Sequence, residues 1–114
     1  MTDVNCVCLV GRLVRDAEIA NTANGTANAR FALAVNRAKK VDGDWKDEVS
    51  YIDIVAYGNM VASLRDRLIK GRQVVIEGSI RQSRWEKDGQ THTKIEVVAD
   101  KVQIPSMSEI ERGF

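Results

Sequence analysis

Cysteine, histidine and proline are scarce in this sequence, and their scarcity excludes several kinds of site. The chain has 114 residues, with two cysteines, one histidine and one proline. Two cysteines and one histidine cannot complete a standard zinc site. Cys6 and Cys8 stand two positions apart in an apolar, extended run, which is poor geometry for a disulfide bond. We therefore expect two small buried hydrophobic side chains and no disulfide framework.

Long apolar runs are also absent. No run approaches the roughly 20 residues that cross a bilayer, and Asp3 and Asn5 stand where a secretory signal would turn from basic to apolar. Hydrophobic residues make up 44% of the chain and charged residues 29%, which are ordinary values for a globular domain. A soluble, cytoplasmic protein of one domain, without a membrane partner, is the expectation.

Candidate catalytic groups are few. His92 lies among polar residues of a predicted hairpin arm, and we expect an exposed strand residue rather than a general base. Asp16 and Glu18 have no partner acid and are typical of solvated turn residues. The chain contains no Gly-rich phosphate loop with its lysine, no Gly-x-Ser-x-Gly and no His-Glu-x-x-His motif. We expect no enzymatic activity, no metal and no cofactor.

Most of the chain alternates apolar and polar residues with a period of two, which predicts β-strands. Five strands are predicted, at residues 4–13, 30–36, 49–57, 74–84 and 91–104. Polar stretches at 21–28 and 42–44 predict loops, and Asp88-Gly89 is a hairpin signal. One helix is predicted after the third strand, with Asn59 as its N-cap and Gly71 as its stop.

The alternation also predicts the core. The inward sets are Phe31, Leu33 and Val35 in the second strand, Ile52, Ile54 and Ala56 in the third, and Val74, Ile76, Gly78 and Ile80 in the fourth. An all-β chain of five strands, with one helix between the third and fourth, has the element order of an OB-fold, a five-stranded Greek-key barrel. An unrelated small barrel or sandwich remains open. Residues 1–105 are predicted to form this domain, and residues 106–114 a short polar C-terminal tail.

The first strand is apolar on both faces. Val4, Cys6, Cys8 and Val10 share one parity, and Val7 and Leu9 share the other. A small barrel has one interior, so the outward set must meet something other than water, and a contiguous apolar patch usually marks an interface. We expect a homo-oligomer through this strand. Cover by the chain's own loops or helix is the alternative.

Basic residues are concentrated in two stretches, although the net charge is only +1. Residues 30–40 contain Arg30, Arg37, Lys39 and Lys40 and no acid. Residues 65–94 contain eight basic residues and four acids. A nearly neutral chain can therefore carry a basic face.

Aromatic residues coincide with this basic character. Tyr51 and Tyr57 lie on the outward parity of the third strand, and Trp85 shares the parity of Arg81, with Arg84 alongside. Unpaired nucleic-acid bases would stack on such rings while basic side chains contact the phosphates. Half-buried tyrosines and a tryptophan packed across a hairpin are the structural alternative.

These residues belong to a longer series that resembles the DNA-binding domain of the bacterial and mitochondrial type of single-stranded DNA-binding protein. The series spans about residues 4–104 in the family's order. Its segments are Asn5-Cys6-Val7-Cys8-Leu9-Val10-Gly11-Arg12-Leu13, Asp16-Ala17-Glu18, Asn24-Gly25, Phe31-Ala32-Leu33-Ala34-Val35, Tyr51-Ile52-Asp53-Ile54-Val55-Ala56-Tyr57-Gly58, Lys70-Gly71-Arg72-Gln73-Val74-Val75-Ile76-Glu77-Gly78, Arg84-Trp85 and Glu96-Val97-Val98-Ala99.

The resemblance implies an OB-fold that assembles as a homotetramer and wraps single-stranded DNA without sequence preference in replication, recombination and repair. It implies that Tyr51, Tyr57 and Trp85 stack on bases and that Lys70, Arg81 and Arg84 contact phosphates. Arg37 and Lys39, from the first basic stretch, complete the predicted DNA-binding set. The predicted oligomer interface comprises Val4, Cys6, Val7, Cys8 and Leu9.

The sequence departs from the family pattern in several places. Lys39 stands where many members have another stacking tryptophan, Asp53 where some have a basic residue, and Ala20 where arginine is frequent. Trp45, in a predicted loop, is a candidate replacement for the missing ring. Members commonly end in an acidic tip that recruits replication and repair proteins, whereas residues 106–114 favour an ordinary surface tail. An OB-fold adaptor of the primosome type, which would bind a protein partner on its sheet face, is the alternative function.

Overall fold

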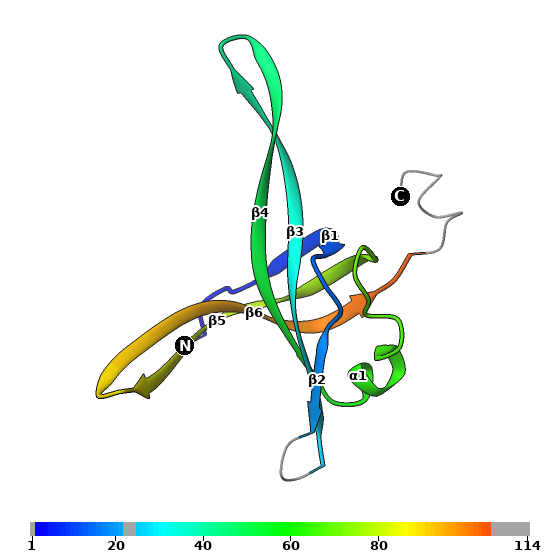
Figure 1. Ribbon diagram of the computed structural model, residues 1–114, viewed down its shortest axis with the longest axis vertical. Helices are drawn as coiled ribbons and strands as arrows, with labels where there is room; N and C mark the ends of the chain where they lie inside the picture. Colours follow the sequence, from blue (N-terminus) through cyan, green and yellow to red (C-terminus); the bar gives the residue numbers. More distant parts are fainter. Residues whose placement is uncertain (1, 22–24, 106–114) are drawn as a thin grey trace.

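The computed structural model describes residues 2–21 and 25–105, which form six strands and one short helix (Figure 1). The elements are β1 (Val7–Leu13), β2 (Glu18–Asn21), β3 (Ala27–Val41), β4 (Asp44–Tyr57), α1 (Asn59–Leu64), β5 (Gln73–Lys87) and β6 (Gln90–Gln103). Within these two ranges, no helix is long and apolar enough to span a membrane. The predicted C-terminal tail, residues 106–114, lies outside the described residues.

Five of the strands close into a barrel. The sheet runs in the order β1-β5-β6-β4-β3-β2, and β1 also pairs with β3 at Arg12↔Ala34 and Leu13↔Leu33. All pairings are antiparallel except that of β4 with β6. The helix lies between the third and fourth barrel strands in chain order, so the predicted five-stranded barrel with one helix is confirmed. The short strand β2, which pairs with β3, was not predicted, because four residues carry too little alternation to be recognised.

The barrel interior is built from the predicted inward parities. Leu33, Ile54, Val74 and Ile76 are fully or almost fully buried, and Val97 of β6 joins them. Val35 is only partly buried, and Ile80 is exposed because it lies where β5 leaves the barrel on its way to the hairpin tip. The alternation therefore predicted the side of each strand correctly, but not where along the strand the barrel ends.

The helix is shorter than predicted and begins differently. Gly58, with φ of 80°, is its N-cap, and no side chain caps it, so the prediction of Asn59 as the capping residue was wrong. A left-handed backbone at residue 58 favours glycine at that boundary. Leu68 is buried but lies after α1, in a loop where the Ala17 N–H donates to the Leu68 carbonyl at 2.9 Å.

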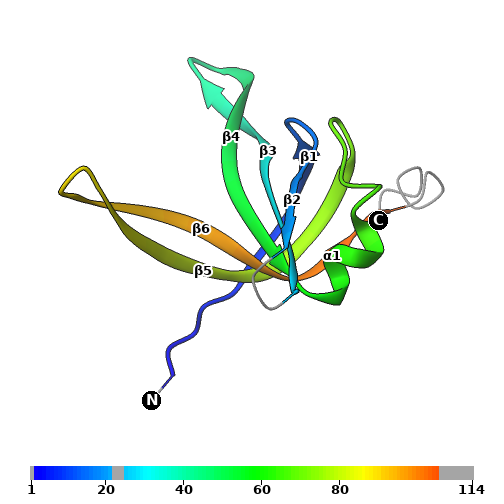
Figure 2. The same cartoon turned by 60° about the horizontal axis from the view of Figure 1, so that its bottom comes forward.

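Two hairpins extend beyond the barrel and project in different directions (Figure 2). β3 and β4 pair continuously to Val41↔Asp44, and β5 and β6 pair to Lys87↔Gln90. Both turn residues of each hairpin have positive φ, which matches the hairpin signal at Asp88-Gly89 and shows that the predicted loop at 42–44 contains a second hairpin turn, at Asp42-Gly43. These arms carry strand faces outside the closed core, where their side chains are available for binding.

Candidate nucleic-acid interface

One sheet face carries most of the side chains that could bind nucleic acid. We call it the outer face, and it is the side of β3, β4, β6 and β5 that points away from the barrel interior. The register fixes its members, because Arg30 opposes Val55 and Val55 opposes Val98, all on the parity opposite to the core. The residues with functional side chains on this face are Arg30, Tyr51, Asp53, Tyr57, Arg81, Trp85, His92, Lys94 and Glu96.

The three predicted stacking residues all lie on the outer face and are open to solvent. Tyr51 is 69% exposed, Tyr57 37% and Trp85 43%. Tyr51 and Tyr57 come from β4, and Trp85 comes from the distal part of the β5–β6 hairpin. The structure thus joins rings from two hairpins on one continuous side of the sheet.

Trp85 is braced by a neighbour that the sequence did not single out. His92 opposes Trp85 in the hairpin register, and their rings stack with centroids 5.7 Å apart and planes inclined by 23°. The expectation that His92 is simply an exposed strand residue was wrong, because one side of its ring is covered by the indole. One face of Trp85 is supported in this way while the other remains accessible.

A buried carboxylate lies among the cations of the outer face. Glu96 is only 2% exposed; its Oε1 accepts a hydrogen bond from Arg81 Nη2 at 2.6 Å and its Oε2 accepts one from Arg30 Nη1 at 3.1 Å. Arg81 Nη2 also donates to the Tyr57 hydroxyl at 2.9 Å, and its guanidinium carbon lies 5.7 Å from the Tyr57 ring centre. Two arginines and one stacking ring are therefore linked through one carboxylate.

The pKa shifts reflect this arrangement. Burial by itself would raise the pKa of Glu96, but the hydrogen bonds and positive charges of Arg81 and Arg30 outweigh it and lower the pKa. The hydrogen bonds from Arg81 to Glu96 and Tyr57 raise the pKa of Arg81. The Glu96 carboxylate and the Arg81 guanidinium are thus ionised at neutral pH.

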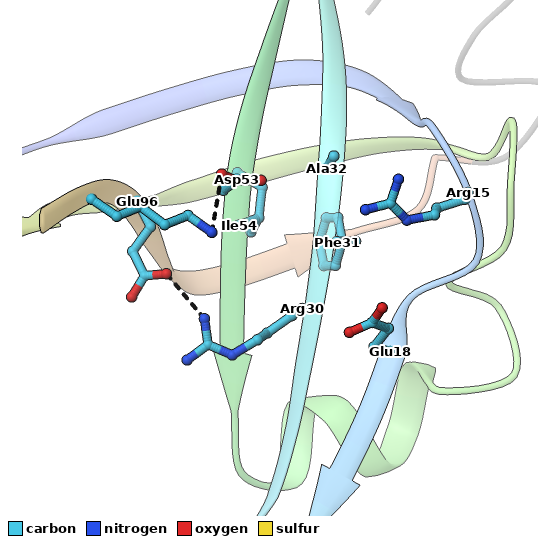
Figure 3. Close-up of a pocket in the computed structure, with 9 residues that line it drawn as sticks. Arg15, Glu18, Arg30, Phe31, Ala32, Asp53, Ile54 and Glu96 are labelled. Atoms are coloured by element: carbon cyan, nitrogen blue, oxygen red, sulfur yellow. Dashed lines mark hydrogen bonds and ion pairs between the residues drawn. The ribbon is translucent and has the colours of Figure 1, made fainter. Parts of the chain in front are cut away.

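A small cavity of about 130 Å³ adjoins this network (Figure 3). Arg30 lies between Glu96 and Glu18, and Glu18 opposes Arg30 in the β2–β3 register. Nearby, Lys94 Nζ forms an ion pair with Asp53 Oδ2 at 3.2 Å. The negative charge of Asp53 is therefore paired with a lysine of β6.

Four of the predicted DNA-binding cations lie elsewhere. Arg84 has the opposite parity to Trp85 and so points to the other side of the hairpin. Arg37 and Lys39 share the inward parity of β3 and both pair with Glu48, at 3.7 and 3.5 Å. Lys70 lies in the loop before β5, on a groove of about 490 Å³ that Arg12 and Arg72 also line. Of the predicted cations, Arg81 alone lies among the rings of the outer face.

Arg30, Lys94 and Glu96 of this face were not predicted as functional residues. One signal could have found Glu96. The two-residue turn at Asp88-Gly89 sets Lys87 opposite Gln90. In an antiparallel hairpin each step backward along the first strand matches one step forward along the second, so Arg81 lies opposite Glu96. The contribution of Arg30 depends on β3 and has no comparable local signal.

Trp45 is the most exposed ring of the described chain outside the predicted set. It is 71% exposed, lies on the same parity of β4 as Tyr51 and opposes Lys40 of β3. Trp45 stands six positions before Tyr51, and Tyr51 stands six positions before Tyr57, so that each spacing is about 20 Å at the usual strand rise. The three rings therefore form a row along one face of β4, and Lys40 lies beside the outermost ring, that of Trp45.

The predicted interface residues divide between two faces. Val7 and Leu9 pack against the core, which directs Cys8 and Val10 outward. Val4 and Cys6 precede β1, and the Asn5 side chain holds this segment to β5 by two hydrogen bonds with the backbone of Ile80, at 2.7 and 2.8 Å. Both cysteines are exposed free thiols, so the expectation that they are buried was wrong for the isolated chain. Sequence alone could not show which apolar parity enters the barrel.

An apolar groove of about 360 Å³ lies beside β1. Its lining includes Val7, Leu9, Ile52, Ile80, Ile95 and Val97. Ile80 and Ile95 are exposed to solvent in the single chain. The uncovered apolar surface therefore continues from β1 onto the inner side of the β5–β6 hairpin.

The geometry agrees with comparisons to known proteins. The model of the single-strand binding protein family matches residues 4–105. The chain is 50% identical over 104 residues to the single-stranded DNA-binding protein of Treponema pallidum, covering 91% of this chain and 59% of that relative. This chain belongs to the single-strand binding protein family. The resemblance inferred from the sequence is thereby confirmed.

Other members of the single-strand binding protein family extend the comparison. The single-stranded DNA-binding protein of Borreliella burgdorferi is 38% identical over 106 residues, with 91% of this chain and 71% of the relative covered. A solved deletion variant of the single-stranded DNA binding protein from Thermus aquaticus superposes with a TM-score of 0.82 at 26% identity, covering 91% of this chain and 51% of that one. The barrel is therefore the OB-fold of this family. The chain spans just over half the length of the Treponema pallidum and Thermus aquaticus proteins.

Proposed function

We propose that this protein binds single-stranded DNA without sequence preference and protects it during replication, recombination and repair. The observation that carries the proposal is the outer face, where three exposed rings lie with Arg81 and Arg30 on one side of the sheet. Every base has a face that can stack on a ring, so such a platform tolerates any sequence. The names of the Treponema pallidum and Borreliella burgdorferi relatives support the same substrate.

The first prediction is a preference for single strands. Poly(dT) is expected to bind at least about tenfold more tightly than duplex DNA of equal length, because the bases of a duplex are already stacked on one another. Binding is measured by quenching of tryptophan emission, since Trp85 and Trp45 are both exposed. A poly(dA)·poly(dT) duplex at the same salt is the control. Equal affinity for the two would refute single-strand binding and favour the adaptor function.

We further propose a homotetramer that forms through β1. Among the described residues, β1 pairs with β3 only at Arg12 and Leu13, so residues 7–11 are unpaired on the side of β1 that faces away from β5. This unpaired edge of β1 supports the proposal. Cys8 and Val10 are exposed beside this edge, and the apolar groove adjoins it. An unpaired strand edge with exposed apolar side chains is a template for pairing with a second strand.

The second prediction therefore concerns Val10→Glu. The parent is expected to sediment at four times the 12.7 kDa chain mass, and Val10→Glu at a lower mass, because a charge would be buried without a partner in the interface. Val49→Glu is the matched control, since Val49 is 42% exposed and Val10 43%, but Val49 lies on β4, which does not pair with β1. Sedimentation equilibrium at micromolar concentration measures this. A parent at the mass of one chain, or equal masses for the parent and Val10→Glu, would contradict the interface.

A further inference from the structure

Glu96 faces outward from β6, yet it is buried to 2% exposure. Removing a carboxylate from water is costly unless it is paired and hydrogen-bonded. Both oxygens of Glu96 are paired, one with Arg81 of β5 and the other with Arg30 of β3 (Figure 3 shows Arg30). Three strands are thereby joined on the outer face through a single side chain.

The two arginines retain the capacity to bind a second anion. The side chain of Arg30 is 50% exposed and that of Arg81 is 41% exposed, although both contact the buried carboxylate. An arginine has five N–H donors. Arg30 uses Nη1 on Glu96, and Arg81 uses Nη2 on Glu96 and Tyr57. The other guanidinium nitrogens have no partner among the described residues and remain free for phosphate oxygens.

The contacts also set the position of a ring. Arg81 donates to the Tyr57 hydroxyl and lies 5.7 Å from the centre of its ring. Because Glu96 anchors Arg81, it also restricts Tyr57 through Arg81. A long arginine side chain held in one rotamer loses less conformational entropy when it binds a ligand.

We propose that Glu96 is a positioning residue for single-stranded DNA, which holds Arg81 and Arg30 so that phosphates and a base stacked on Tyr57 are bound together. This inference rests on the proposed function and adds Arg30 to the residues that contact DNA. An acidic residue in a DNA-binding face should by its charge alone weaken binding. In this protein, the gain in DNA binding from holding Arg81 and Arg30 in place exceeds the loss from the repulsion between the Glu96 carboxylate and the phosphates. Removing the charge of Glu96 therefore weakens binding.

The test compares two substitutions that change the charge of the outer face equally. Glu96→Gln is expected to weaken poly(dT) binding about fivefold, because the arginines lose their anchor. Asp53→Asn removes a carboxylate from the same face that contacts Lys94 rather than Arg81, and it is expected to tighten binding about twofold. Similar tightening by both substitutions would overturn the proposal, and it would leave the proposed function intact if the parent still prefers poly(dT) to duplex DNA.

A double-mutant cycle separates positioning from general stability. In an Arg81→Ala background, Glu96→Gln is expected to change poly(dT) affinity much less than in the parent, because the guanidinium through which Glu96 mainly acts is absent. A purely structural effect would weaken binding equally in both backgrounds and would overturn the proposal.

A second variant keeps the test decisive if Glu96→Gln does not fold, which thermal unfolding by circular dichroism detects. Glu96→Asp retains the charge but is one methylene shorter and cannot reach both arginines. It is expected to weaken poly(dT) binding several-fold. Parent affinity in this variant would overturn the proposal.

Discussion

Replacing Gly78 by alanine is expected to lower the free energy of unfolding by at least about 3 kcal/mol, the upper part of the usual range for overpacking. A Cβ atom on Gly78 would lie 2.0 Å from the Val98 carbonyl oxygen and 3.0 Å from the Ala99 Cα. These are backbone atoms of β6 that cannot rotate away. Gly78 also pairs with Val7 of β1, so the displacement would spread to a second junction of the barrel.

The cause is a local irregularity of the sheet. The β5–β6 register shifts between Glu77 and Gly78, where the pairing passes from Glu77↔Lys101 to Gly78↔Ala99. The shift brings the two backbones close together, and only a residue without Cβ fits there. Urea unfolding followed by circular dichroism, at one fixed protein concentration because assembly contributes to stability, measures the loss.

Gly43→Ala is the control for this prediction. Gly43 lies at the tip of the β3–β4 hairpin with φ of 85°, and a Cβ there would meet nothing within 4 Å. The expected cost is about 1 kcal/mol, from the left-handed backbone alone. Equal losses for Gly78→Ala and Gly43→Ala would show that the close contact with Val98 does not constrain the fold.

Much of this fold could be predicted because strand alternation is a local property. Leu33, Ile54 and Ile76 were assigned to the interior from their parity alone, and they are buried. Strand alternation cannot predict which face is buried where both parities are apolar, as in β1. Whether Cys8 or Leu9 enters the core depends on which strands lie beside β1. Strand alternation fails also for β2, whose pairing partner β3 decides its conformation.

The candidate site divides in the same way. Tyr51, Tyr57 and Trp85 could be placed on one face by parity, and the structure places them there. The cations could not, because a long side chain on the wrong parity, such as Arg84, is as basic in sequence as Arg81. Glu96 between Ile95 and Val97 is typical of an exposed strand residue. One of its two hydrogen-bond partners is Arg30, 66 residues away in the chain, and no local signal contains that contact.

Removing all three predicted rings is expected to weaken poly(dT) binding more than a hundredfold. Each stacked base contributes about 1–3 kcal/mol, so the variant with Tyr51, Tyr57 and Trp85 replaced by alanine loses at least about 3 kcal/mol if the rings act independently. The fold should survive, since all three side chains lie outside the buried core. Thermal unfolding by circular dichroism checks this. Fluorescence anisotropy of a labelled oligo(dT) measures binding without relying on Trp85.

A control is needed because exposed apolar area alone could bind DNA nonspecifically. Ile95→Ala removes an exposed apolar side chain from the opposite parity of β6 and is expected to leave the affinity for oligo(dT) within about twofold of the parent. If the triple variant binds like Ile95→Ala, the rings do not stack on bases. A separate variant adds Trp45→Ala to the triple variant and tests the remaining ring of β4. We expect it to lose about 1–3 kcal/mol more of binding free energy. The reason is that Trp45 shares the parity of Tyr51 and lies beside Lys40, so that a base and a phosphate can be bound together there.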